Sequence, residues 1–92
     1  MKTSSLIIRY ENSFKKDYKK VTKQGKDLGK MLFVIDCLSK GIKLDRKYCD
    51  HALKGEYKGF NECHISPDWL LIYCIDGDIL VLSRTGSHSE LF

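Results

Sequence analysis

The chain has 92 residues, a length that suits one hydrophobic core, so we expect residues 1–92 to form a single domain. Its composition, 42% hydrophobic and 30% charged, is that of an ordinary globular protein and does not favour a disordered chain. The net charge of +4 is spread unevenly: residues 1–58 carry 15 Lys/Arg against 7 Asp/Glu, and residues 59–92 carry 1 against 5. The basic first part indicates a polyanionic partner such as nucleic acid, although lysines on solvated helix faces would give the same count.

The sequence has no feature of a membrane or secreted protein. No stretch approaches the roughly 20 apolar residues that a membrane-spanning helix needs, and the N-terminus lacks the apolar core and cleavage site of a secretory signal. The cysteines include no Cys-x-x-Cys pair, which favours reduced thiols over a disulfide framework. They are Cys37, Cys49, Cys63 and Cys74. We therefore expect a cytoplasmic protein that does not bind membranes.

The first half of the chain predicts a short strand and then two helices. Residues 6–10 are an apolar run typical of a strand, and Asn12 or Ser13 is placed to cap a basic amphipathic helix. A second helix is expected from its N-cap, Asp27, to Gly41, which suits the positive φ of a helix C-terminus. The two helices form a hairpin, and its core positions repeat with helical spacing: Phe14, Tyr18, Val21, Leu28, Met31, Leu32, Ile35 and Leu38.

The second half predicts a loop followed by a sheet. Residues 42–56 show no periodicity, so we expect a loop that carries ionisable side chains. Strand-like segments follow over 57–65, 69–75 and 79–84, separated by turns at 66–68 and 76–77. The last two strands are apolar on both faces, so both faces of the sheet must be covered. The expected fold class is α+β, with an N-terminal helical hairpin packed on a small antiparallel sheet.

All three histidines, His51, His64 and His88, lie at or near the edge of a predicted strand or loop. Imidazole titrates near neutral pH, so a histidine cluster can accept and donate protons in one reaction cycle. Because neighbouring antiparallel strands alternate in direction, we expect His64, Asp68 and Arg84 at one edge of the sheet. The pattern predicts an acid–base cluster with a cation beside it.

Other chemistries fit the same segments less well. Cysteine and histidine pairs at positions 49, 51, 63 and 64 suggest zinc ligands, yet adjacent strand residues point to opposite faces. Serines surround His88, but no nucleophile elbow accompanies them. The scattered single glycines form no phosphate-binding loop. We therefore expect neither a metal nor a cofactor.

Three motifs lie in the second half: DHALKGEYKG over residues 50–59, ECHISPDWLLIY over 62–73 and SRTGSHSELF over 83–92. Together they resemble the RelE/ParE superfamily of type II toxins, and specifically the YafQ-like messenger-RNA endonucleases. The resemblance implies a RelE-like ribonuclease fold and ribosome-dependent cleavage of messenger RNA in the A site. It also implies a DinJ/RelB-like antitoxin, a dimeric ribbon-helix-helix protein through which alone the toxin would bind promoter DNA.

The resemblance further implies an active site. Its catalytic residues are His51, His64, Asp68, Arg84, His88 and Phe92, and its substrate-binding residues are Lys54 and Trp69. In RNA cleavage of this type the 2′-hydroxyl attacks the adjacent phosphorus and the 5′-oxygen leaves. The two residues expected to transfer protons are His88, as general acid, and Asp68.

Supporting roles are expected of the other residues in this set. His51 and His64 would assist proton transfer or hold the phosphate, and Arg84 would bind phosphate oxygens through its planar fork. The Phe92 ring would stack on a base. For Trp69, core packing is the competing interpretation.

Two other functions are compatible with the sequence. One is a non-catalytic ParE-like toxin that binds a protein target such as gyrase, and the other is a basic RNA-binding module. The ParE-like toxin would have little use for three histidines together with an aspartate and an arginine, and the endonuclease is the favoured prediction.

Overall fold

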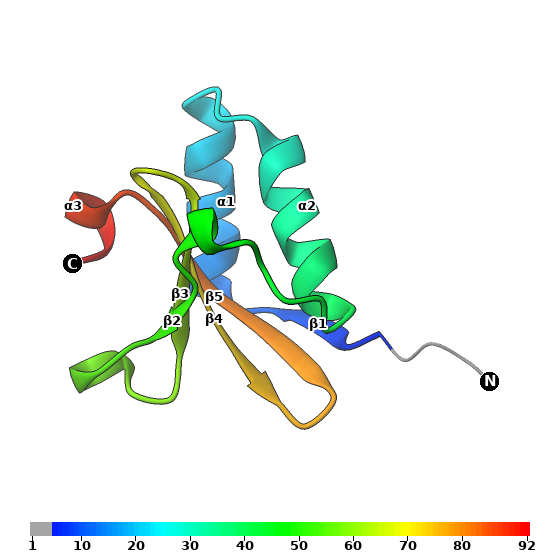
Figure 1. Ribbon diagram of the computed structural model, residues 1–92. Coiled ribbons are helices and arrows are strands. Elements are labelled where there is room, and N and C mark those ends of the chain that lie inside the picture. Colours follow the sequence, from blue (N-terminus) through cyan, green and yellow to red (C-terminus); the bar gives the residue numbers. More distant parts are fainter. Residues whose placement is uncertain (1–4) are drawn as a thin grey trace.

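The computed structural model describes residues 5–92, and residues 1–4 of the predicted domain lie outside this range. The first elements are β1 (Ile7–Tyr10), α1 (Asn12–Lys23) and α2 (Leu28–Ser39). Two short 3-10 turns and a strand then replace the expected loop: η1 (Arg46–Tyr48), β2 (His51–Ala52) and η2 (Gly55–Tyr57). The last elements are β3 (Asn61–Ser66), β4 (Trp69–Asp76), β5 (Ile79–Gly86) and α3 (His88–Leu91). Figure 1 shows their arrangement.

The sheet has five strands in the order β1-β5-β4-β3-β2. The three long strands form the predicted antiparallel meander, and β2 extends it antiparallel to β3. The sheet is nevertheless mixed and not purely antiparallel as predicted, because β1 pairs in parallel with β5 in the register Ile7↔Ile79 to Tyr10↔Leu82. The α+β class with a helical hairpin is confirmed.

The two long helices lie side by side on one face of the sheet, which we call the helix-side face (Figure 1). Buried side chains from both helices pack there against strand residues such as Leu71 and Leu80. Leu32 is 60% exposed, contrary to the prediction that it belongs to the core, and Tyr18 is also exposed. Successive residues of a helix are rotated by 100°, so when Met31 and Ile35 point to the sheet, Leu32 points away from it. Within residues 5–92, no helix is both long and apolar enough to cross a membrane.

The ends of the helices follow local chemistry at α2 but not at α1. Asp27 caps α2 by accepting a hydrogen bond from the Gly29 amide, and Gly41 has the predicted positive φ of 72°. The prediction of a side-chain cap at Asn12 or Ser13 is wrong, because Glu11 is the N-cap residue and makes no side-chain cap bond. The Ser13 hydroxyl instead donates to the backbone carbonyl of Ser83 and ties α1 to β5.

The opposite face of the sheet, which we call the site-side face, is covered by short segments. Tyr57 and Phe60, from η2 and the residues after it, pack with Leu91 of α3 against Leu70 and Ile72. The prediction that both faces are covered is therefore confirmed. Residues 57–60 were expected in a strand but form a turn, in which Gly59 has a φ of 95°. The meander's second turn lies at residues 77–78, one residue later than expected.

Candidate active site

A row of side chains crosses the site-side face of the sheet. His51 on β2 pairs with Glu62 on β3, Glu62 pairs with Ile72 on β4, and Ile72 pairs with Arg84 on β5. Residues directly opposite one another share a face, and so do residues two apart on one strand. His64 therefore lies on this face as well, and the sheet itself brings His51, Glu62 and His64 together.

Glu62 is a buried carboxylate between two histidines. Glu62 is only 5% exposed, and its Oε2 lies 3.2 Å from Nε2 of His64 and 3.6 Å from Nε2 of His51. Burying a carboxylate is unfavourable unless polar partners receive it, and the two imidazoles are those partners. Glu62 is not among the site residues predicted from the sequence. The signal was the Glu-x-His spacing in a predicted strand, which puts both side chains on one face.

The third histidine, His88, is held by the turn between β3 and β4. Asp68 in that turn accepts hydrogen bonds from both the backbone amide and the Nδ1 of His88, each at 3.1 Å. These hydrogen bonds keep the pKa of Asp68 below its usual value, and the bond from the His88 backbone amide has a larger effect than the bond from the His88 ring. A capping box between Ser87 and Glu90 starts α3 and orients His88. The centroids of the His64 and His88 rings are 5.6 Å apart.

Hydrogen bonds decide which ring nitrogens face outward. His51 Nδ1 lies 2.6 Å from the Cys49 carbonyl, which only accepts, so this nitrogen carries a proton. Carboxylates occupy Nε2 of His64 and Nδ1 of His88 in the same way. No hydrogen bond within residues 5–92 involves Nδ1 of His64 or Nε2 of His88. Both nitrogens are therefore available to a substrate, and Nε2 of His51, 3.6 Å from Glu62 Oε2, makes no hydrogen bond within these residues either.

Arg84 lies on the same face but is paired with helix α1. Its Nε donates to Asp17 Oδ2 at 2.6 Å and its Nη2 to Oδ1 at 3.3 Å, and the bond to Asp17 raises the pKa of Arg84. Ser83 has no partner on β4, a bulge that brings Arg84 opposite Ile72. Arg84 on β5 lies two strands away from Glu62 on β3, a backbone separation of roughly 10 Å. The structure thus places Arg84 beside the histidines and not among them.

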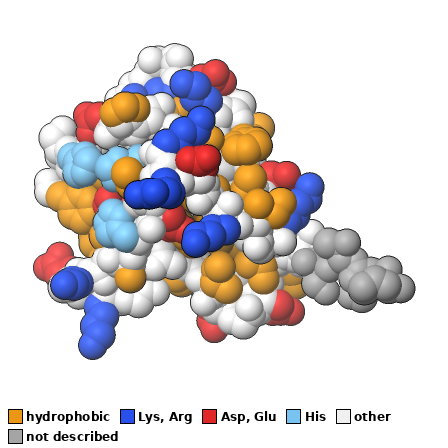
Figure 2. Space-filling model, viewed as in Figure 1, with side chains coloured by type: hydrophobic (Ala, Val, Ile, Leu, Met, Phe, Trp, Pro, Cys, Tyr) orange, Lys and Arg blue, Asp and Glu red, His pale blue; other side chains and the backbone are white. Residues whose placement is uncertain are grey.

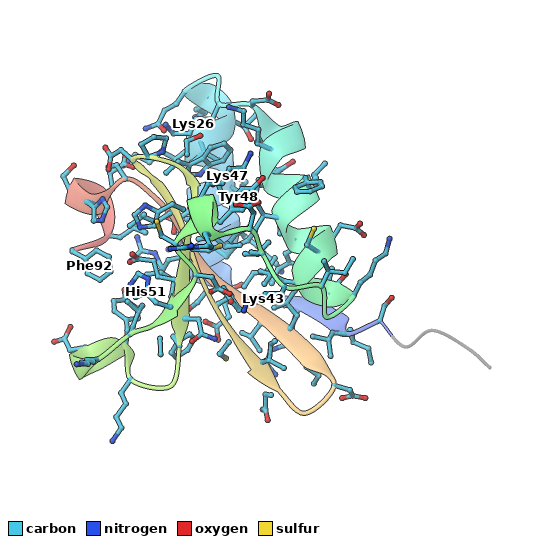
Figure 3. All side chains as sticks on the ribbon, in the orientation of Figure 1. Lys26, Lys43, Lys47, Tyr48, His51 and Phe92 are labelled. Carbon is cyan, nitrogen blue, oxygen red and sulfur yellow. The ribbon has the colours of Figure 1, made fainter. Side chains whose placement is uncertain are left out.

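The last residue, Phe92, extends the row of rings. It is 62% exposed, and its ring centroid is 6.4 Å from that of His88 and 5.6 Å from that of Tyr57. Figure 3 shows Phe92 and His51 on the same side of the molecule. Lys54 is exposed at the start of η2, at the rim of this face. Both predicted residues are accessible to a large ligand.

Trp69 is the exception among the predicted residues. It is 3% exposed, packs in the helix-side core and donates a hydrogen bond from Nε1 to Thr85 Oγ1 at 2.9 Å. Because the helices cover its ring, the prediction that Trp69 binds substrate is wrong. It is a structural residue, as the competing interpretation held.

The cysteine-based zinc site is not formed. Cys63 is fully buried on the helix-side face, while the neighbouring His64 points to the other face, and burial raises the pKa of the Cys63 thiol to about 12. A different set has the spacing of metal ligands: Glu62, His64 and His88 each offer one ligand atom, all within 4.8 Å of one another. The cluster is therefore able to perform proton transfer or to bind a metal ion.

Charge surrounds the cluster. Figure 2 shows the histidine side chains together on one side of this view, with Lys and Arg side chains beside them. Imidazoles next to cations suit a polyanion whose reaction needs protons moved. Together the fold and this site define a small α+β protein of the RelE-like class.

Comparison with known proteins identifies the family. Residues 6–92 match the model of the YafQ family, bacterial toxins of type II toxin-antitoxin systems, and the chain belongs to this family. It is 37% identical over 86 residues to the mRNA interferase toxin YafQ of Escherichia coli K12, covering 92% of this chain and 94% of that one.

Solved structures agree with this assignment. A copper-bound mutant toxin from Helicobacter pylori is 47% identical and superposes with a TM-score of 0.91, covering 95% of this chain and 99% of that chain. In the E. coli DinJ-YafQ toxin-antitoxin complex, the matching chain is 36% identical with a TM-score of 0.88, covering 96% and 98%. The resemblance noted in the sequence is confirmed.

Proposed function

We propose that this chain is the toxin of a type II toxin-antitoxin system and an endonuclease that cleaves messenger RNA on the ribosome. The E. coli relative named an mRNA interferase toxin supports this function. The observation that carries it is the cluster of three histidines in which two carboxylates hold His64 and His88 and leave one nitrogen of each ring available. We place its action in the cytoplasm, where ribosomes translate.

Two of the histidines have the geometry of a base and an acid. His64 Nδ1 takes the proton of the 2′-hydroxyl, and the 2′-oxygen attacks the adjacent phosphorus. Protonated His88 then gives the proton on Nε2 to the 5′-oxygen as the P–O5′ bond breaks, which leaves a 2′,3′-cyclic phosphate and a free 5′-hydroxyl. Positioned proton transfer contributes roughly 100- to 10,000-fold to such a rate. The reaction needs no metal, since the imidazoles supply both proton transfers.

The remaining groups position the histidines or bind charge. Asp68 makes both of its bonds to His88, so we assign it to orienting the acid and not to moving a proton to the substrate. Glu62 orients His64 in the same manner. His51, on the other side of Glu62, holds the phosphate. Arg84 adds the field of a permanent cation beside the cluster, which favours the phosphorane as its negative charge rises. Phe92 stacks on a base next to the cut.

The basic first part of the chain supplies affinity for the ribosome. Exposed lysines of α1 other than Lys20, which pairs with Glu90, and exposed lysines such as Lys54 are available to ribosomal RNA phosphates. Contacts of this kind release counterions, so binding should weaken steeply as salt rises. The function proposed here therefore includes both the message and the ribosome as partners.

The second partner is an antitoxin. The related DinJ-YafQ complex supports a DinJ/RelB-like protein, dimeric and of the ribbon-helix-helix type, that binds this toxin. An acidic segment would complement the cationic surface of the toxin. We propose that promoter DNA is bound only through this complex and that no membrane is involved.

Mapping of RNA ends on translated messages tests the proposal. Wild type should cut the message, while His88→Ala should cut it at least 100-fold more slowly and still fold, because His88 is exposed. Ser89→Ala, a change at the exposed neighbouring residue, is the matched control and should cut like wild type. An intact message with wild type, or full activity of His88→Ala, would refute the endonuclease. A ParE-like toxin would instead leave messages whole and block its protein target.

A further inference from the structure

A cleft of about 880 Å³ opens beside the histidine cluster, between α2 and η1. Its lining runs from α2, on the helix-side face, to residues 64–67 at the end of β3, so the cleft extends to the residue that carries the proposed base. Its other walls include Phe33 and Lys30 of α2 and Lys47 and Tyr48 of η1. The volume falls within the range of about 300 to 1,000 Å³ typical of small-ligand sites. None of the roles assigned above uses this cleft.

Two aromatic rings lie next to each other in the wall of the cleft. Phe33 is 56% exposed, although it stands on a helix whose neighbouring positions supply the core. Its ring centroid lies 6.5 Å from that of Tyr48 with an interplanar angle of 35°. Helix packing does not explain an exposed phenylalanine at this position, whereas an apolar ring beside a cluster of acid–base groups suits a flat ligand.

Positive charge lines the same cleft. Lys47 Nζ lies 5.3 Å from the Tyr48 ring centroid, and Lys30 stands on the opposite wall. The one carboxylate in the lining, Asp27, is engaged as the cap of α2. A smaller hollow of about 340 Å³ shares Lys30 and Asp27 with the cleft and reaches Asp68. Figure 3 shows Lys47 and Tyr48 between His51 and α2.

We propose that this cleft is a nucleotide subsite for the residue that adjoins the cut. Its base stacks on the exposed face of the Phe33 ring, beside Tyr48, and its phosphate binds Lys30 and Lys47. Single-stranded RNA is recognised by rings on which unstacked bases lie and by cations along the backbone, and this cleft offers both. His64, shared by the cleft and the cluster, places the scissile phosphate next to the bound base. The proposal rests on the endonuclease function proposed above.

The test compares two exposed neighbours on α2. Phe33→Ala removes the stacking ring, and Leu32→Ala, a similar truncation at a residue 60% exposed that does not line this cleft, is the matched control. On ribosomes programmed with a message of varied sequence, Phe33→Ala should lower kcat/KM about 5- to 150-fold, the value of one stacked base. It should also weaken the nucleotide preference at one position next to the cut. Phe33→Trp should restore both, and Phe33→Leu, which keeps an apolar side chain, should not.

The outcomes separate the subsite from the function. If wild type cuts and His88→Ala does not, but Phe33→Ala cuts with wild-type rate and preference, the subsite is wrong and the endonuclease stands. If Phe33→Ala leaves cleavage unchanged and weakens antitoxin binding, the cleft is a protein-docking surface and the proposal is overturned. A wild type that leaves every message intact overturns both.

Discussion

Replacing Glu62 with glutamine tests whether a buried carboxylate positions the proposed base. The Glu62 Oε2 lies 3.2 Å from Nε2 of His64, and the residue is 5% exposed. A hydrogen bond to a charged group contributes about 1.5 to 3 kcal/mol, and each 1.4 kcal/mol is tenfold. We therefore expect Glu62→Gln to lower kcat about 10- to 150-fold. KM should change little, because the carboxylate contacts histidines and not the substrate.

The same substitution should behave differently in unfolding. Glutamine fills the same space and its amide oxygen is still able to accept a hydrogen bond from Nε2 of His64, so the free energy of unfolding should fall by only about 1 kcal/mol. Thermal unfolding and single-turnover cleavage on one preparation measure both quantities. Glu56→Gln, at an exposed carboxylate in η2, is the control and should match wild type in each. Wild-type kcat in Glu62→Gln, or a loss of kcat that merely follows a lower Tm, would refute the reasoning.

Three further predictions concern the frame around the site. Asp17→Asn weakens the pair with Arg84, so a urea titration should show about 1 to 3 kcal/mol less unfolding free energy; an unchanged midpoint would show that the pair is not stabilising. Trp69→Phe should lower the free energy of unfolding by about 1 kcal/mol, because it lacks the hydrogen bond to Thr85, and should keep wild-type kcat/KM. A loss of cleavage without a loss of stability would show that Trp69 acts in the site. The pKa of Glu90 is lowered from 4.5 to about 2, chiefly by the hydrogen bond from the Ser87 backbone amide. The ionised Glu90 carboxylate therefore stabilises the fold above about pH 4.5, and this stabilisation is lost as the pH falls toward 2. Wild type should accordingly melt a few degrees above Glu90→Gln at pH 7 and equally near pH 2; a gap that stays constant with pH would exclude this linkage.

The parts of the fold that sequence analysis predicted are those determined locally. The start and end of α2 depend on Asp27 and Gly41, and the meander depends on turn residues next to each strand. Pairing of β1 with β5 joins residues such as Ile7 and Ile79, which are far apart in the chain, and no local pattern reports it. The sequence over residues 42–56 predicts a loop, because 3-10 turns and a two-residue strand have no detectable periodicity.

The candidate site shows the same division. Motifs indicated the three histidines and Asp68, but only the register of β2 against β3 shows that Glu62 lies between two of the rings. The resemblance implies a substrate-binding role for Trp69, whereas the structure buries its ring in the helix-side core. The strand over 69–75 is apolar on both faces, so no local pattern shows which face the ring occupies.

The most direct test of the account uses a translated message with one 2′-deoxyribose immediately 5′ of the cut. Since the 2′-hydroxyl is the nucleophile and His64 its base, we expect no cleavage at that phosphate. The unmodified message should yield a cyclic phosphate and a 5′-hydroxyl. Cleavage of the substituted phosphate at the unmodified rate, with a 5′-phosphate on the product, would contradict the account.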